Sequence, residues 1–475
     1  MMRDSPEWKK HNTAGTQLNT EKLDLFEKAP VRQAVLKLVV PSVLSQVIVL
    51  LYNLADTYFI GLLNDPRQTA AVTVSAPAFL MLSAVANLFA VGGAGRVSSA
   101  LGRQDYFAAE RIAAIAFWFG AISAVLFSII FSLTANPILT LCGATDQTRE
   151  LAYGYVKWTV IYGGTGTILN LTLSNLIRSE GNAGIAAIGV ALGCIANIIL
   201  DPLFILPHVC NLGAVGAGMA TGLSNLLATT FFLFFLLKKR KTEVININPR
   251  HLCFAHAHLS EIISVGIPSA LQYALTVMAV AALSKFVSAY GNEAVAGMGI
   301  VKKIDQLPLF FSIGVANGLM PLLAYNSAAG NHSRRRDAFR FGCGLSLGFS
   351  CLCLVIFELT APTLTELFIK DEITIVYSSR FLRIMVIAMP MMSVCYPLIV
   401  QFQAMRRVKE ALICSLLRKG ILDIPLLFFF DHIIPLYGCM LVQPVVDTVS
   451  LLVALLFYRR IQDKQGQYCS SYGLL

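Results

Sequence analysis

Two carboxylates stand inside long apolar stretches of the sequence, where charged side chains are rare. Asp56 follows Tyr52 by four residues and Asp201 follows Asn197 by four, so each pair shares one face of a helix. Asn53 lies about one turn before Asp56. Ionisable groups at membrane depth are energetically unfavourable and therefore suggest a functional site. Carboxylates in such places bind protons or hard cations, which is the chemistry of an ion-coupling site.

The sequence around these carboxylates has the composition of a polytopic membrane protein. Of 475 residues, 56% are hydrophobic and only 13% are charged, too few to cover a soluble domain. The apolar residues fall in repeated runs of roughly 20, the length that spans a bilayer core. These runs do not alternate as barrel strands do. Because backbone groups in lipid must be hydrogen-bonded within the segment, we expect helices.

The apolar runs predict an all-α integral membrane protein with twelve transmembrane helices. Their approximate ranges are 33–62, 70–102, 108–135, 149–178, 183–206, 213–237, 258–289, 293–328, 335–359, 374–405, 408–431 and 437–459. Lys and Arg concentrate in both tails and in the loops after even-numbered helices, whereas the other loops are poor in them. Since cytoplasmic loops are enriched in these residues, we expect both termini in the cytoplasm and the chain in a bacterial inner membrane.

An internal duplication relates the two halves at an offset of about 227 residues. The segment PSVL at 41–44 reappears as PSAL at 268–271, and Arg178 after the fourth helix corresponds to Arg406 after the tenth. We therefore predict two pseudo-symmetric six-helix bundles with a cleft between them. The predicted organisation is an N-terminal tail (1–32), a first bundle (33–237), a basic linker (238–257), a second bundle (258–459) and a C-terminal tail (460–475).

Helical depth brings further polar groups to the level of the two carboxylates. A rise of about 1.5 Å per residue places Asp56, Asp201 and Thr221 together in the outer half of the membrane. In low dielectric, one of two neighbouring carboxylates takes a proton, or both bind a cation. The structural alternative is that Asp56 caps a helix end and Asp201 precedes a proline turn. The predicted cation-coupling residues are Tyr52, Asn53, Asp56, Asn197, Asp201 and Thr221, with Asp56, Asn197, Asp201 and Thr221 as candidate Na⁺ ligands.

A second polar group lies near mid-membrane in the eighth helix. We assign these residues, with one glutamine of the seventh helix, to a substrate cleft: Lys302, Lys303, Asp305, Gln306 and Gln272. A structural ion pair between one of the lysines and Asp305 is the alternative, because a buried charge requires a partner. Asp423 and Asp447 are weaker candidates in the second half.

The sequence lacks the residues that are characteristic of several other classes of function. The net charge of +10 forms no basic stripe beside aromatic residues, so we expect no nucleic acid partner. The eleven cysteines show no zinc spacing. An enzyme would need a nucleophile–base or metal constellation, and no intramembrane histidine is paired with Asp, Ser or Cys. We therefore predict a transporter that needs no cofactor beyond H⁺ or Na⁺ and works as a monomer.

An alternative to an exporter of small molecules is a lipid-linked oligosaccharide flippase of a related fold. It would favour a cleft rich in Arg and Lys, because these side chains recognise pyrophosphate. Lys302 and Lys303 are the only such intramembrane cations near the centre.

The polar groups lie in segments that occur together along nearly the whole chain. These segments are LYNLADT at 51–57, LGRQD at 101–105, IRSEGN at 177–182, NIILDPLFI at 197–205 and GAVGAGMAT at 213–221. In this combination, over residues 33–459, the chain resembles the multidrug and toxin extrusion (MATE) family.

The resemblance implies a V-shaped exporter with a central cleft that exchanges H⁺ or Na⁺ for organic, often cationic, amphipathic molecules. In one branch of the family the coupling cation binds in the N-terminal bundle. The positions that match this site are Tyr52, Asp56, Asn197, Asp201 and Thr221. Other members carry a Glu in the seventh helix and an Asp in the tenth. This chain has Gln272 and no carboxylate at those places, which puts coupling in the first half.

Overall fold

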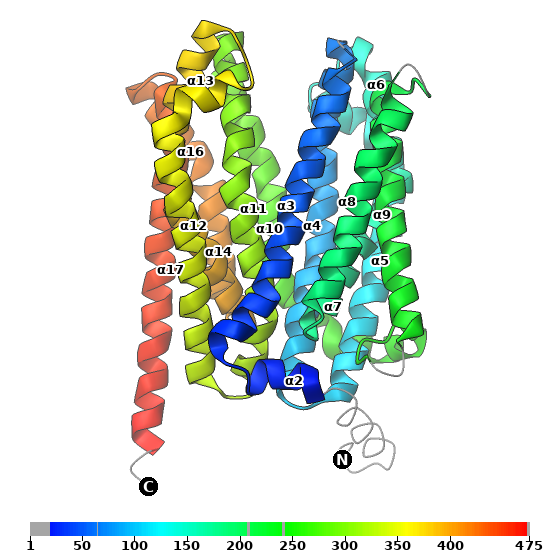
Figure 1. The fold of residues 1–475 in the computed structure, drawn as a ribbon, viewed down its shortest axis with the longest axis vertical. Helices are drawn as coiled ribbons and strands as arrows, with labels where there is room; N and C mark the ends of the chain where they lie inside the picture. Colours follow the sequence, from blue (N-terminus) through cyan, green and yellow to red (C-terminus); the bar gives the residue numbers. More distant parts are fainter. Residues whose placement is uncertain (1–19, 64, 207–209, 240–242, 473–475) are drawn as a thin grey trace.

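The computed structural model describes residues 20–63, 65–206, 210–239 and 243–472. The rest of the predicted tails and linker, namely 1–19, 240–242 and 473–475, lies outside the described residues. Within them the chain is helical and contains no strand. Two groups of helices stand side by side and diverge toward one end, which gives a V shape (Figure 1). The short helix α2 and the C-terminal end of α17 lie at the opposite, narrow end.

The helices follow the predicted order in both halves. The first half contains α3 (Val31–Gly61), α4 (Pro66–Gly102), α5 (Tyr106–Leu141), α6 (Asp146–Val156), the π-helical turn η1 (Lys157–Tyr162), α7 (Gly164–Ser179), α8 (Ala183–Ile205) and α9 (Gly213–Lys238). The second half contains α10 (Ala255–Ser288), α11 (Asn292–Ala328), α12 (His332–Glu366), α13 (Glu372–Val386), α14 (Met389–Ala404), α15 (Val408–Leu416), the π-helical turn η3 (Leu417–Ile421), α16 (Asp423–Ile433) and α17 (Tyr437–Tyr472).

Most of these helices can cross a bilayer as single segments. Among the described residues, nine are long and apolar enough to do so, and α13 with α14 makes a tenth span bent by 46°. The segments α6–η1–α7 and α15–η3–α16 occupy the places of the other two predicted helices.

The sequence predicts the fourth, tenth and eleventh helices as continuous, whereas the structure breaks each of them. In the fourth helix, the π-helical turn η1 and Gly163, which follows it, separate α6 from α7. In the eleventh, Gly420 within η3 has a φ of 130°, a conformation that glycine adopts without steric cost. In the tenth, Pro390 is the second residue of α14 and offers no backbone N–H to the preceding turn, which permits the bend.

Two segments predicted as tails are partly helical. Helix α2 (Thr20–Glu27) lies within the predicted N-terminal tail, and α17 continues through most of the predicted C-terminal tail. The linker contains the 3₁₀ turn η2 (Pro249–Phe254), and α10 begins inside it. The indole N–H of Trp118 donates to the carbonyl of Ile247 at 2.9 Å, which attaches the linker to α5.

Helix α2 ties the start of the chain to the second half. Phe26 is fully buried and stacks on Tyr325 of α11 with ring centroids 5.0 Å apart. Arg334 of α12 donates to the backbone carbonyls of Phe26 at 2.6 Å and Leu25 at 3.1 Å. Because α3 follows α2 closely, this contact links the first helix of one half to two helices of the other.

Glycines bring the backbones of the two halves into contact toward the narrow end. A methyl group on Gly266 of α10 would lie 1.9 Å from the carbonyl oxygen of Leu88 in α4. One on Gly92 of α4 would lie 2.2 Å from the carbonyl oxygen of Ile262. Both separations are far below ordinary van der Waals contact, so only glycine allows α4 and α10 to approach this closely.

Helices α3 and α11 cross in the same manner. A methyl group on Gly314 of α11 would lie 2.7 Å from the Cα of Val43, and one on Gly318 would lie 2.6 Å from the Cα of Val39. The two halves therefore meet along these two helix pairs, α4 with α10 and α3 with α11, and α4 also contacts α11, where Gly102 approaches the backbone of Tyr325.

A charged cluster flanks the contact between α4 and α10. Glu261 of α10 accepts hydrogen bonds from Arg96 of α4 and from Arg406, which follows α14. The Arg96 side chain is only 6% exposed, so this guanidinium of the first half is buried against a carboxylate of the second.

Replacing Gly266 with alanine should lower the free energy of unfolding by about 1–3 kcal/mol, because the added methyl must displace the backbone of α4. Thermal unfolding of the purified protein in detergent measures this change. Gly348 of α12 has no atom within 4 Å of an added methyl, so Gly348→Ala is the matched control and should change stability little. Equal losses in the two variants would contradict the backbone contact.

Candidate cation site and central cavity

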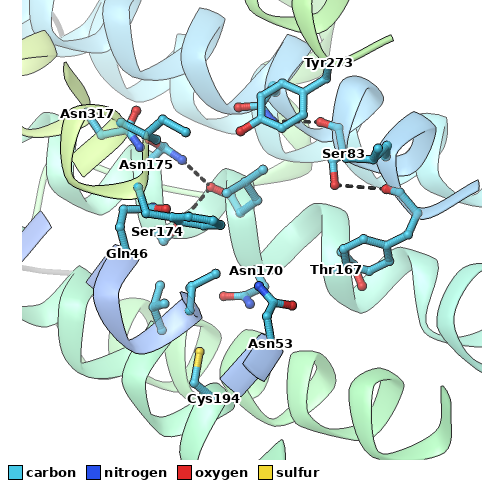
Figure 2. A pocket seen from close by; sticks show the side chains of 18 of the residues that line it. Gln46, Asn53, Ser83, Thr167, Asn170, Ser174, Asn175, Cys194, Tyr273 and Asn317 are labelled. Carbon is cyan, nitrogen blue, oxygen red and sulfur yellow. Dashed lines mark hydrogen bonds between the residues drawn. The ribbon is translucent and has the colours of Figure 1, made fainter. Parts of the chain in front are cut away.

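A cavity of about 570 Å³ lies between the two halves. Residues of α3, α4, α6, α7, α8 and α9 line one side, and residues of α10, α11 and α14 line the other. Figure 2 shows amide and hydroxyl side chains around it, among them Gln46, Asn53, Ser83, Asn170 and Asn317. The volume is that of pockets that hold drug-sized molecules.

Charged side chains are few on the described wall of this cavity. Asp56, Arg178 and Lys303 carry its formal charges, and every other described lining residue is neutral. Phe79 and Phe310 contribute apolar surface between the amides. A wall of this kind offers many weak contacts and few fixed charges.

Asn197, Asp201 and Thr221 form a buried polar cluster on the first-half side of the cavity. They are respectively 1%, 0% and 5% exposed. With its amide oriented to satisfy both neighbours, Asn197 donates to the Asp201 carboxylate at 3.3 Å and accepts from the backbone N–H of Thr221 at 3.2 Å. Asn197 and Thr221 line the cavity, and Asp201 is not among its lining residues.

Asp56 reaches the same region from α3. One oxygen of its carboxylate is buried and has no hydrogen-bond partner. Asp56 and Asp201 are close enough to interact electrostatically, and both act on the Tyr52 hydroxyl. A buried carboxylate oxygen without a partner is satisfied by a proton or by a bound cation.

The structure brings the six predicted coupling residues to one side of the cavity. Tyr52 and Asn53 line it from α3 beside Asp56, and α3 packs against α8, which carries Asn197 and Asp201. The four predicted Na⁺ ligands are one pair of carboxylates, one amide and one hydroxyl. All of them offer oxygen atoms, which hard cations prefer.

The sequence analysis did not identify two residues of this region, Tyr155 and Cys194. Tyr155, near the end of α6, interacts electrostatically with Asp56, and Cys194 of α8 interacts with Tyr52; both line the cavity. Cys194 could have been found, because it precedes Asn197 by three residues and lies on the same helical face. Tyr155 carries no such signal, because it lies on α6 and shares no helix with the other residues of the site.

The predicted substrate-cleft residues divide between two faces of α11. Lys303 and Gln306 line the cavity, together with Gln272 of α10. Lys302 and Asp305 do not line it. The three-residue spacing within each pair explains the division, because residues i and i+3 share a helical face.

Lys302 and Asp305 face an ionic network inside the second half. Both interact electrostatically with Lys419 of η3 and with Asp447 of α17. Asp423 lies beside the same break and accepts a hydrogen bond from the backbone N–H of Gly420 at 2.8 Å, which stabilises the start of α16.

A buried salt bridge forms the centre of this network. Arg418, which is 1% exposed, donates to Asp447 at 2.9 Å. Gln443 donates to the other oxygen of the same carboxylate at 2.9 Å and accepts from Lys419 at 2.7 Å. The Arg418 guanidinium also lies 4.1 Å from the ring centroid of Tyr396, a residue that lines the cavity.

A helical membrane protein whose two halves enclose a central polar cavity has the architecture of a secondary transporter. The sequence matches the family MatE twice, at residues 41–203 and 268–429. These matches begin at the same offset of about 227 residues that separates the repeated segments. The chain belongs to the multidrug and toxin extrusion (MATE) family of membrane transporters, which supports the prediction of a transporter rather than an enzyme.

Similar proteins extend over nearly the whole chain. The multidrug export protein MepA of Staphylococcus saprophyticus is 27% identical over 447 residues, which cover 94% of this chain and 98% of that protein. MepA of Staphylococcus aureus is 28% identical over 449 residues, with the same coverage.

Solved structures confirm the predicted all-α, V-shaped, twelve-helix fold. An outward-facing conformation of a multidrug resistance MATE family transporter of the MOP superfamily has a TM-score of 0.88 at 23% identity, covering 94% of this chain and 99% of that one. A MATE crystal structure in the bent conformation has a TM-score of 0.86 at 23% identity, covering 95% and 100%.

Replacing Asp447 with asparagine should lower the free energy of unfolding by about 3–5 kcal/mol, because Arg418 then keeps a buried charge without its carboxylate. Thermal unfolding in detergent measures the loss. The double variant Arg418→Met with Asp447→Leu removes both charges and should lose less than Asp447→Asn alone. A double variant less stable than the single one would show that the pair is not the source of the effect.

Proposed function

We propose that this chain is an antiporter that exports organic, cationic amphipathic drugs or toxins in exchange for H⁺ or Na⁺. The observation that carries the proposal is the Asp56 carboxylate, with one buried and unpartnered oxygen, beside the cluster of Asn197, Asp201 and Thr221. Relatives that match nearly the full length are named multidrug export proteins, which supports this class of substrate.

The cavity has the chemistry that binding of varied amphipathic cations requires. Phe79, Phe310 and other apolar side chains offer surface to a hydrophobic body, and neutral amides accept or donate hydrogen bonds without demanding one geometry. A cationic head group finds the Asp56 carboxylate and the faces of Tyr52 and Tyr155, since aromatic rings attract cations.

The narrow end lies in the cytoplasm under this proposal. Among the described residues, the basic positions that follow α4, α11 and α14, namely Arg103, Arg334 and Arg406, belong to this end, as do α2 and the end of α17 (Figure 1). The glycine contacts hold the halves together there while they diverge on the outer side, so the structure corresponds to an outward-facing state. The chain works as a monomer in the bacterial inner membrane with both termini in the cytoplasm, and it requires no cofactor beyond the coupling ion.

Exchange results because the coupling ion and the cationic substrate both bind at the Asp56 carboxylate. In the outward-facing state, H⁺ or Na⁺ enters from outside and binds at Asp56 and its oxygen neighbours. Neutralising this carboxylate weakens the attraction for a cationic substrate in the cavity, which then leaves. Helix α3 shifts or bends at Pro41, where a backbone hydrogen bond is missing, and the narrow end opens. The ion is released inward, and the next substrate enters.

Replacing Asp56 with asparagine should reduce gradient-driven export at least about tenfold, the factor that corresponds to about 1.4 kcal/mol of lost interaction. The measurement is uptake or efflux of a fluorescent organic cation in proteoliposomes, with pH and Na⁺ gradients imposed separately. Whichever gradient drives the wild-type protein identifies the coupling ion.

The matched control is Asp146→Asn, which removes a carboxylate at the start of α6. The Asp146 side chain is 92% exposed, so its loss should leave export unchanged. Full export by Asp56→Asn, with the wild-type response to both gradients, would show that coupling takes place elsewhere.

A further inference from the structure

A lysine of the second half faces the candidate coupling carboxylate across the cavity. Lys303 of α11 and Asp56 of α3 both line it. Each acts on the other electrostatically, and Asp56 is the charged group that attracts Lys303. The third charged group of the described cavity wall, Arg178, lies near the end of α7 and donates to Asn175 at 3.0 Å.

Asp56 and Lys303 also lie at matching depths. Helices α3 and α11 touch where Gly314 approaches Val43. At a rise of about 1.5 Å per residue, Lys303 lies about 16 Å outward of Gly314 along α11, and Asp56 lies about 20 Å outward of Val43 along α3. From that contact the two helices diverge toward the open end (Figure 1). A closing motion of the outer parts therefore brings these two side chains toward each other.

We propose that Lys303 is a tethered counter-cation for Asp56. When the outer parts of α3 and α11 close, the Lys303 ammonium pairs with the Asp56 carboxylate and displaces the coupling ion toward the cytoplasm. When they separate again, the carboxylate is free to take a cation from outside. The inference rests on the proposed role of Asp56 as the coupling group.

A tethered cation compensates the charge of Asp56 in the part of the transport cycle in which no coupling ion is bound. After the coupling ion leaves, Asp56 would be an unpaired charge in a site of low dielectric, which is strongly unfavourable. The flexible four-carbon stem of lysine lets its ammonium reach a carboxylate in one state and withdraw in another. A permanent cation in the cavity would otherwise only repel cationic substrates.

Lys303 is distinguished from the other ionisable groups around Asp56 by its place on the opposite half. Tyr52 lies on the same helix as Asp56, and Tyr155 and Asp201 belong to α6 and α8 of the same bundle. These groups move with Asp56 if the bundles move as bodies. The distance from Asp56 to Lys303 is the one that changes with the state of the transporter.

Replacing Lys303 with glutamine should lower, by about tenfold, the concentration of coupling ion at which export is half-saturated. The reason is that a charge at close range to a carboxylate changes the affinity of that carboxylate for a cation by at least this factor. The maximal rate of export should fall as well, since release of the ion to the cytoplasm becomes slower. The assay is export of a fluorescent cation from proteoliposomes, titrated with Na⁺ or with pH according to the driving gradient.

Two variants control for effects other than the charge at this position. Lys303→Arg keeps the cation and should remain close to wild type in both parameters. Lys285→Gln removes a lysine from the last turn of α10, where the side chain is exposed, and should change neither. Equal behaviour of Lys303→Arg and Lys303→Gln would overturn the proposal, because side-chain shape would then matter and charge would not.

A binding measurement on purified protein tests the same point without transport. The measurement is the thermal stabilisation that NaCl or acid pH confers, with choline chloride at equal ionic strength as the reference for NaCl. The ion concentration that gives half of the maximal stabilisation should be about tenfold lower in Lys303→Gln than in wild type. Lys303→Met serves if the glutamine variant is poorly folded. An unchanged midpoint would overturn the proposal.

Comparing Asp56→Asn with Lys303→Gln distinguishes an error in the role of Lys303 from an error in the role of Asp56. If Asp56→Asn abolishes ion dependence while Lys303→Gln keeps the wild-type half-saturation, Asp56 couples without a tethered cation. If Asp56→Asn retains ion dependence, the coupling role of Asp56 is wrong and that of Lys303 falls with it.

Discussion

The shape of the molecule depends on backbone contact between its halves toward the narrow end. Gly266 of α10 and Gly92 of α4 let these helices meet with no side chain between them. Such a contact consists mainly of dispersion between flat surfaces, which forms only at short range and breaks without rupturing a hydrogen-bond ladder. Glu261 and Arg96 add a charged contact at the same level. The halves are thus held together where they touch and are free to diverge elsewhere, which is the condition for a large cavity between them.

Charge is distributed differently in the two halves. The network of the second half balances three cations with three carboxylates: Arg418, Lys419 and Lys302 with Asp447, Asp305 and Asp423. Its central salt bridge, between Arg418 and Asp447, is hydrogen-bonded, so loss of either side chain leaves the other charge buried and unpaired. In the first half, Asp56 keeps an unpartnered oxygen beside the cavity. A balanced network favours a rigid half, whereas an unbalanced carboxylate makes the other half responsive to ions.

Much of the fold and part of the candidate site follow from the sequence because their signals are local. Apolar length marks the helices, and four-residue spacing places Asn197 beside Asp201. What could not be predicted depends on tertiary contacts. The interruptions at η1 and η3 lie within helices that the sequence predicts as continuous, and no local pattern places Tyr155 of α6 beside Asp56. The adjacent Lys302 and Lys303 look alike in the sequence, and only the packing of α11 sends one to the network and the other to the cavity.

Coupling between the outer site and the narrow end needs no chain of side chains between them. Helices α3 and α11 are long and pass from the glycine contacts to the level of Asp56 and Lys303. Because these two residues lie about 16–20 Å beyond the crossing at Gly314, a small rotation there changes their separation much more than it changes the contact itself. The segments of α3 and α11 outward of this crossing act as levers, so that pairing of two charges at the outer level produces a change at the crossing and at the bend of α3 beside it, at Pro41. Each helix is a physical element that both sites act on, which is what energetic coupling over such a distance requires.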